Sequence, residues 1–154
     1  MTDRLVLLPF SPAMAQAVLA GDVSEHRVAS GYPHRDTPDI AHAIMRDPEV
    51  LADTTWIITT KADGEIIGDC GWFRDGESTD TVEIGYGLAE SARRQGFASE
   101  AVAAVVEHAW SIGVARIVAT TDDENVASVR VLEKLGFGLV ASEGGQRRYE
   151  LDRP

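Results

Sequence analysis

The chain has 154 residues, 44% of them hydrophobic and 25% charged, which is the ordinary balance of a single globular domain over 1–154. Its 14 basic and 25 acidic residues give a net charge of −11, which argues against nucleic acid and anionic membranes as main partners because phosphate binding needs clustered Lys and Arg. One cysteine, Cys70, excludes an internal disulfide framework, no Cys/His group has zinc-ligand spacing, and no apolar run reaches the roughly 18 residues of a membrane span.

The first half of the chain predicts three strands and two helices. Ser11 can cap a helix with Pro12 at its first position, and Thr37 with Pro38 opens a second helix in the same way. Apolar segments on either side of an Asp-Gly turn predict a hairpin whose second strand continues to Phe73. The predicted elements are strands at 5–8, 56–58 and 66–73 and helices at 12–19 and 37–47.

The second half opens with a strand of period two. Apolar side chains alternate with Glu83, Gly85 and Gly87, which predicts one apolar face and an opposite face left open around Glu83. A helix with apolar residues at helical spacing follows and ends at Gly113, and Asn125 starts another helix. The predicted elements are strands at 82–88 and 115–121, helices at 96–112 and 125–135, and a closing hairpin of 137–140 with 147–151.

This order, βααβββαβαββ, predicts the fold class. Interleaved strands and helices indicate an α/β (α+β) domain with a mixed sheet of about seven strands covered by helices. The crossover from the strand at 82–88 through the helix at 96–112 to the strand at 115–121 predicts a right-handed connection between parallel strands.

The loop before the helix at 96–112 has the features of an anion site. Free N–H groups and the dipole of a helix start favour phosphate, and Gly96 allows close approach of the backbone. Arg93 and Arg94 can offset the acidic charge locally, and a guanidinium binds phosphate in a bidentate fork. The alternative is a solvated loop before an ordinary helix. The loop lacks the Gly-Lys-Ser/Thr of a P-loop.

Three ordered segments, Glu83–Leu88, Arg93–Ala101 and Thr120–Phe137, resemble the GNAT superfamily of acyl-CoA-dependent N-acyltransferases. The sequence looks most like the branch that includes the ribosomal-protein N-terminal acetyltransferases. The likeness is strong over 65–142, whereas 1–50 match only in general layout. The resemblance implies the GNAT fold, acetyl-CoA as co-substrate and no metal.

The resemblance also implies which residues bind the cofactor. The loop matches the family segment that wraps the CoA pyrophosphate with backbone amides, and Leu88 N–H can donate to the thioester oxygen. Asn125 and Ser128 match helix positions that face the pantetheine and the thiol, although Asn125 is also a good N-cap. The implied cofactor residues are Tyr86, Gly87, Leu88, Arg93, Arg94, Gln95, Gly96, Phe97, Ala98, Ser99, Asn125 and Ser128.

The proposed chemistry needs a base for the amine and a donor for the departing thiolate. Glu83, on the glycine-flanked face, is the predicted base; the alternative is a carboxylate that only pairs with an arginine. Many superfamily members carry a Tyr at the position of Leu132, where it acts as the acid that protonates the thiolate. Because this chain lacks that Tyr, Ser128 is predicted to donate to the thiolate instead. Tyr149 is a second candidate, with a core aromatic as the simpler interpretation.

Three residues are predicted to lie near the acceptor amine, namely His34, Trp72 and Glu83. His34 lies where the variable acceptor-side loop of the superfamily falls, but a surface-loop histidine is the simpler interpretation. Core packing is the alternative for Trp72. We expect Cys70 to be a core residue as well.

The sequence therefore predicts an N-acetyltransferase that acts on a primary amine, either a protein N-terminus or a small cationic amine. A non-catalytic acyl-CoA-binding or sensing module and a mononucleotide binder stay open as alternatives, as does a homodimer. The first residues, Met1 to Arg4, lack a basic region followed by an apolar stretch. We therefore expect no signal peptide and a soluble cytoplasmic protein.

Overall fold

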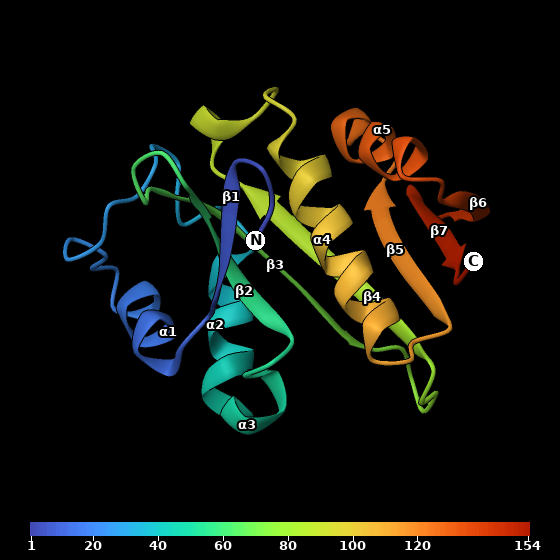
Figure 1. Cartoon of the computed structure of the whole chain (residues 1–154), viewed down its shortest axis with the longest axis horizontal. Helices are drawn as coiled ribbons and strands as arrows, with labels where there is room; N and C mark the ends of the chain where they lie inside the picture. The colour runs from blue at the N-terminus through green and yellow to red at the C-terminus, as the bar shows by residue number, and fades with distance from the viewer.

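A computed structural model describes residues 1–154, and all of its strands join one sheet in the order β1-β2-β3-β4-β5-β7-β6 (Figure 1). The β4–β5 pair is parallel and the other pairs are antiparallel. The prediction of a mixed seven-stranded sheet with a parallel crossover is confirmed. The strands are β1 (Leu5–Pro9), β2 (Thr55–Thr60), β3 (Ile66–Arg74), β4 (Thr81–Leu88), β5 (Arg116–Asp122), β6 (Gly138–Glu143) and β7 (Gln146–Asp152).

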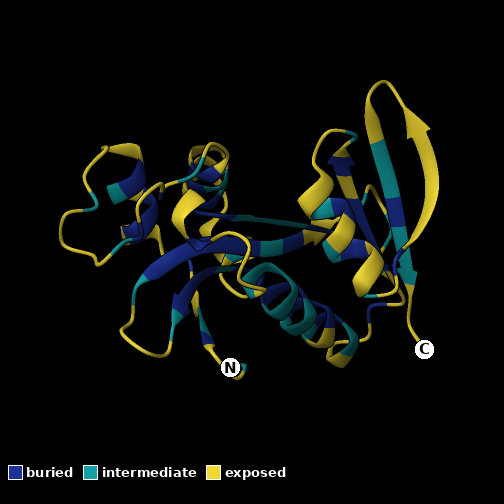
Figure 2. Cartoon of the chain, turned by 90° about the horizontal axis from the view of Figure 1, so that it is seen from above, coloured by how far each residue is buried: buried dark blue, intermediate teal, exposed yellow.

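Helices cover both faces of this sheet. The helix α4 lies on one face, and α1 and α2 lie on the other, as the two perpendicular views show (Figures 1 and 2). The observed order adds a one-turn helix and a 3₁₀ turn to the predicted one, and both are too short to have a hydrophobic period. The helices are α1 (Pro12–Leu19), α2 (Thr37–Arg46), α3 (Pro48–Leu51), α4 (Phe97–Ser111) and α5 (Val126–Lys134), with the 3₁₀ turn η1 at Glu90–Ala92.

Two of the three predicted helix caps are confirmed. Ser11 Oγ accepts from the amide of the third helical residue of α1, and Asn125 Oδ1 accepts from Ser128 N at 3.1 Å. The third prediction is wrong, because α2 follows Asp36 and has no side-chain cap. Thr37 is already helical, and its hydroxyl donates instead to Asp69 at 2.8 Å.

The core lies between the sheet and the helices on its two faces (Figure 2). The predicted apolar face of β4 is confirmed, since Val82, Ile84 and Leu88 are all buried. Burying each such side chain stabilises the fold by roughly 1.5–3 kcal/mol. Tyr149 is 1% exposed and belongs to this core, so its interpretation as a core aromatic is confirmed. Cys70 is also 1% exposed, as expected.

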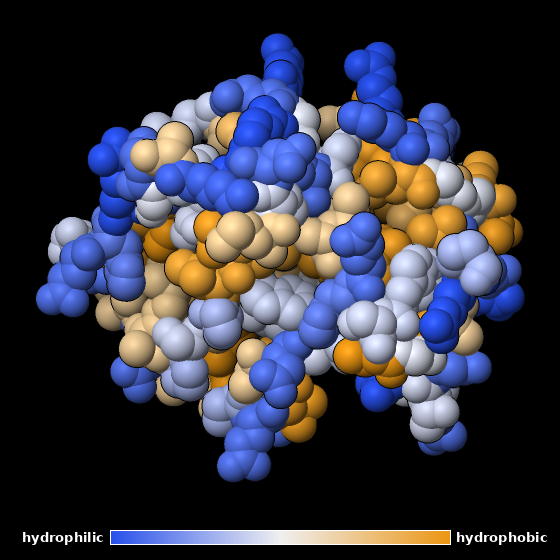
Figure 3. All heavy atoms as spheres, in the orientation of Figure 1, coloured by the Kyte–Doolittle hydropathy of each residue, from blue (hydrophilic) through white to orange (hydrophobic).

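Polar and apolar residues are mixed on the molecular surface. On the face seen in Figure 3, hydrophobic residues lie in small groups between hydrophilic ones. Every residue of β6 is exposed, and this strand pairs only with β7 at the end of the sheet (Figure 2). None of the helices combines the length and the hydropathy that a membrane span requires.

The strands β4 and β5 separate in the middle of the sheet. Their pairing covers only Thr81 to Glu83 of β4 and Arg116 to Val118 of β5. Beyond Glu83, β4 stays paired with β3 up to Leu88, whereas β5 stays paired with β7. One edge of β4 is therefore open over residues 84–88, and a gap widens between the two strands.

Candidate active site

The open edge of β4 presents backbone amides to the gap. In an antiparallel ladder, successive residues direct their N–H groups to opposite sides. Ala89 N donates to Ile67 O of the β3 side at 2.8 Å. The amides of Leu88 and, two residues earlier, Tyr86 therefore point away from β3 and into the gap.

The loop between η1 and α4 forms a second group of free amides. Arg94 has a φ of 64° and Gly96 a φ of 83°, so left-handed residues turn the backbone just before the helix. None of the amides of 94–99 donates to a protein acceptor, and α4 has no side-chain cap. Successive free amides in such a turn, at a helix N-terminus, form an anion-binding concavity.

Arg4, which precedes β1, contacts this loop through its guanidinium group. Its Nη1 donates to Gln95 O at 2.9 Å, its Nε lies 3.3 Å from Glu100 Oε1, and its guanidinium lies 4.4 Å from the centre of the Phe97 ring. The sequence alone does not indicate this contact, because more than ninety positions separate Arg4 from the loop. Three contacts to one short segment fix the orientation of the free amides.

Two cavities, of about 480 and 420 Å³, open along the gap. The smaller one reaches the loop at Arg93 and Ala98, and the larger one reaches Trp72 and the helix α2. The two share part of their lining and therefore meet there. The shared residues are His34, Arg35, Asp36, Tyr86, Asn125 and Ser128.

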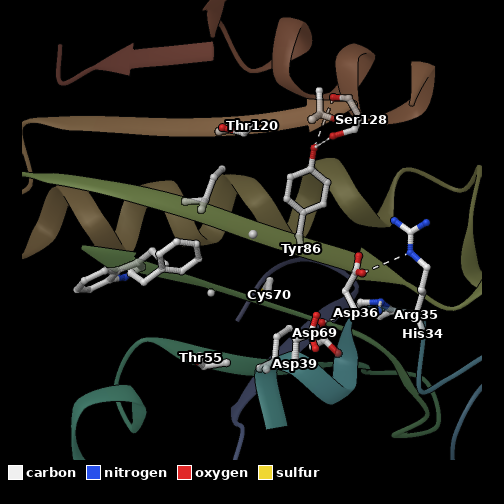
Figure 4. Close-up of a pocket in the computed structure, with 18 of the residues that line it drawn as sticks. His34, Arg35, Asp36, Asp39, Thr55, Asp69, Cys70, Tyr86, Thr120 and Ser128 are labelled. Carbon is white, nitrogen blue, oxygen red and sulfur yellow. Dashed lines mark hydrogen bonds and ion pairs between the residues drawn. The ribbon is translucent and has the colours of Figure 1, made fainter. Parts of the chain in front are cut away.

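A pair of hydroxyl groups lies on one side of this junction. The Tyr86 side chain points from β4 toward α5, and its Oη lies 2.6 Å from Ser128 Oγ (Figure 4). Burial raises the pKa of the Tyr86 phenol, and its hydrogen bond with Ser128 acts in the opposite direction. Leu132 is fully buried one turn further along α5 and lines the larger cavity without a polar group.

A buried carboxylate lies on the other side. Asp69, which is fully buried, accepts hydrogen bonds from the Tyr32 hydroxyl at 3.2 Å and the Thr37 hydroxyl at 2.8 Å. It also lies 2.6 Å from His34 Nε2 (Figure 4). The Asp36 amide donates to His34 Nδ1, so Nδ1 carries no proton and Nε2 donates to Asp69. Burial, followed by the Asp69 charge, raises the pKa of Tyr32.

This cluster corrects the interpretation of His34 as a surface-loop residue. The His34 side chain is only 9% exposed, because Asp69 binds it and its ring covers Gly87. A side-chain carbon added at Gly87 would lie within 3.0 Å of three His34 ring atoms. The available signal was Asp69 itself, since a lone aspartate in an otherwise apolar strand needs buried partners.

Sequence comparison identifies the family. The family model described as "Acetyltransferase (GNAT) domain" matches residues 4–138. The chain belongs to the GNAT family. GNAT is a family of acyltransferase enzymes, and this membership confirms the superfamily resemblance.

Individual relatives agree with the GNAT assignment. The uncharacterized N-acetyltransferase YoaA of Bacillus subtilis is 32% identical over 96% of this chain and 85% of that protein. A second uncharacterized N-acetyltransferase of that organism, YjdG, is 38% identical over 55% of this chain, and the match spans about half (51%) of its own length. The Salmonella typhimurium acetyltransferase yncA, solved with its cofactor acetyl-CoA, aligns at a TM-score of 0.64 with 17% identity, over 96% of this chain and 93% of that one. This last likeness concerns the fold.

The structure brings most of the predicted GNAT site residues to the two cavities. Those lining a cavity are His34, Trp72, Tyr86, Gly87, Leu88, Arg93, Ala98, Asn125 and Ser128. Those of the loop and first helical turn that line neither are Arg94, Gln95, Gly96, Phe97 and Ser99. In this second group the backbone amides are free, and the Arg94 and Gln95 side chains are exposed.

Glu83 and Tyr149 lie outside the cavities. Glu83 is half-buried at the point where β4 and β5 begin to separate, opposite Phe73 and Val118. Tyr149 lies within the core on β7. The structure therefore does not bring either residue into direct contact with the junction.

The larger cavity is acidic. Its charged residues are Arg35 and four aspartates: Asp36, Asp39, Asp69 and Asp122. Arg35 Nε also lies 3.4 Å from Asp36, which compensates that one carboxylate. No group of three or more potential ligands is arranged to hold a metal ion.

Proposed function

We propose that this chain is a single-domain enzyme that transfers an acetyl group from acetyl-CoA to a primary amine by direct attack on the thioester. The observation that supports this proposal most directly is the order of groups along one continuous cleft. These are the free loop amides, the open edge of β4, the hydroxyl pair and the acidic cavity. An anionic co-substrate would enter from the smaller cavity and a cationic acceptor from the larger one.

The loop and the strand edge would hold the co-substrate. The free amides of 94–99 suit the oxygens of a pyrophosphate, and Arg93 and Arg94 add local positive charge. The free amides of Tyr86 and Leu88 can donate hydrogen bonds to an extended ligand that has amide groups of its own. Such a ligand would pair with the open edge of β4 as a neighbouring strand does. Leu88 N–H is proposed as the donor to the thioester oxygen, where negative charge develops during attack.

The acidic cavity favours a cationic acceptor. Its four aspartates outnumber its single arginine, and the whole chain carries a net charge of −11. The negative electrostatic potential of these groups raises the local concentration of protonated amines. Small cationic amines and peptide N-termini both fit this charge, and a panel of acceptors separates them.

The acceptor must lose a proton before it attacks. We retain Glu83 as the proposed base, acting through water because its carboxylate lines neither cavity. Replacing Glu83 with Gln should lower the rate at neutral pH, where the base acts, and should remove the fall of the rate toward acid pH from the pH–rate profile. An unchanged profile would assign the base elsewhere, with the cavity residue Asp36 as the next candidate and Asp36→Asn as the matched variant.

A non-catalytic acyl-CoA-binding module is a second candidate. The specific observation in its favour is the apolar Leu132 in the cavity wall, because many superfamily members carry a tyrosine there. Both candidates predict CoA binding, but only the enzyme releases free thiol.

The deciding experiment offers acetyl-CoA together with a panel of polyamines, small monoamines and peptides with free N-termini. Thiol release that depends on both the protein and the amine supports the transferase. Saturable CoA binding without thiol release across the panel would support the binding module instead. Protection by ATP without protection by CoA would contradict both.

A further inference from the structure

The hydroxyl pair at the junction offers a proton donor that the sequence did not indicate. The thiolate leaving an acyl transfer needs a proton, and Leu132 supplies none. The other polar side chains shared by both cavities are His34, Arg35, Asp36 and Asn125. His34 Nε2 is committed to Asp69, and Asn125 Oδ1 caps α5. Tyr86 and Ser128 therefore remain as the uncommitted hydroxyl donors.

We infer that the Tyr86 hydroxyl is the catalytic acid that protonates the departing sulfur, while the Ser128 hydroxyl orients Tyr86 and stabilises its phenolate. This inference rests on the proposed acetyl transfer. It reassigns the donor role from Ser128, which the sequence predicted, to a side chain predicted only as part of the cofactor strand.

Chemistry favours the phenol over the alcohol. A phenol has an ordinary pKa of about 10, close to the roughly 8.5 of a thiol, so a proton passes between them with little energetic penalty. A serine hydroxyl is a far weaker acid. Burial raises the pKa of Tyr86, which keeps the phenol protonated at neutral pH and ready to donate.

The hydrogen-bond geometry leaves the Tyr86 proton available. When Ser128 Oγ donates to Tyr86 Oη across their 2.6 Å separation, the Tyr86 hydrogen is free to face the cleft. Its alternative acceptor, the Ser128 carbonyl, is 3.4 Å away and binds it weakly. Ser128 is fixed in turn, because its own amide donates to Asn125 Oδ1 at 3.1 Å.

Acetyl transfer forms one C–N bond and breaks one C–S bond. The lone pair of the amine nitrogen forms the new C–N bond, and the C–S bond breaks with its electron pair left on sulfur. The Tyr86 proton moves to that sulfur and gives a free thiol. The proton that nitrogen loses returns through solvent to the phenolate, so the net change is one proton from nitrogen to sulfur.

The test compares Tyr86→Phe with Ser128→Ala, and uses Tyr149→Phe as the matched control. Tyr149 is a buried tyrosine whose hydroxyl has no hydrogen-bond partner and lies outside both cavities. We expect Tyr86→Phe to lower kcat by about 100-fold or more, with the KM for acetyl-CoA changed less than about threefold because backbone amides bind that molecule. Ser128→Ala should lower kcat by about tenfold, and Tyr149→Phe should leave it unchanged.

An equilibrium measurement makes the test independent of the acceptor amine. The wild-type chain should bind CoA about 3- to 10-fold more tightly than desulfo-CoA, which lacks the sulfur. In Tyr86→Phe this preference should fall to about one, while the affinity for desulfo-CoA stays the same.

The two failures are distinguishable. A wild-type chain that binds CoA but releases no thiol overturns the proposed function and this inference together. A wild-type chain that turns over, with Tyr86→Phe retaining more than about a third of kcat and the full preference for CoA, overturns the inference alone.

Discussion

The buried Asp69 cluster supports a quantitative prediction. Replacing Asp69 with Asn keeps the shape but removes the charge that three donors share, those of Tyr32, Thr37 and His34. A hydrogen bond to a charged group contributes about 1 kcal/mol more than a neutral one, so three such bonds lose about 3 kcal/mol. For a chain of this size, each kcal/mol shifts Tm by roughly 2–4 °C, and we expect Tm to fall by about 6–12 °C.

Calorimetric or dichroism melting measures this shift, and two further variants control it. Tyr32→Phe removes one donor and should lower the free energy of unfolding by about 1 kcal/mol. Asp53→Asn makes the same chemical change at an exposed position and should leave Tm within about 1 °C. A Tm for Asp69→Asn within about 2 °C of wild type would refute the reasoning, because the three bonds would then not depend on the charge.

Three other predictions follow from the same cleft. Changing Arg93 and Arg94 to Ala should weaken CoA binding and flatten its dependence on salt, measured by titration at two ionic strengths; unchanged affinity would reject the loop as the phosphate site. Gly87→Ala should displace the His34 ring and raise the KM for the acceptor amine, with a crystal structure of the variant as the check. Burial raises the pKa of the Cys70 thiol, so almost no thiolate exists at pH 8 and iodoacetamide should alkylate Cys70 only after denaturation; rapid alkylation of the native chain would contradict its burial.

The fold was largely predictable because its signals are local. Alternation over 82–88, helical spacing after Gly96 and the caps at Ser11 and Asn125 each depend on residues within a few positions of one another. The short helix α3 was not predictable, since four residues starting at Pro48 cannot express a period.

The candidate site residues were predictable only where they lie close together in one segment of the sequence. The loop before α4 lies within a single stretch of sequence, and its amides at 94–99 are free, as Gly96 and the helix start indicated. The Asp69 cluster joins residues more than thirty positions apart, which no local pattern reports. The role of Tyr86 was also hidden, because the two-residue alternation of β4 places it on the apolar face. Only the separation of β4 from β5 shows that its hydroxyl reaches Ser128.

The half-paired strand β4 has a consequence for amide exchange. Gly85 and Gly87 direct their N–H groups to β3, whereas Tyr86 and Leu88 direct theirs to the gap. Hydrogen exchange along this strand should therefore alternate residue by residue, slow at the glycines and fast between them. A ligand seated along the open edge would abolish that alternation, so that four consecutive amides would report occupancy of the cleft without any catalytic assay.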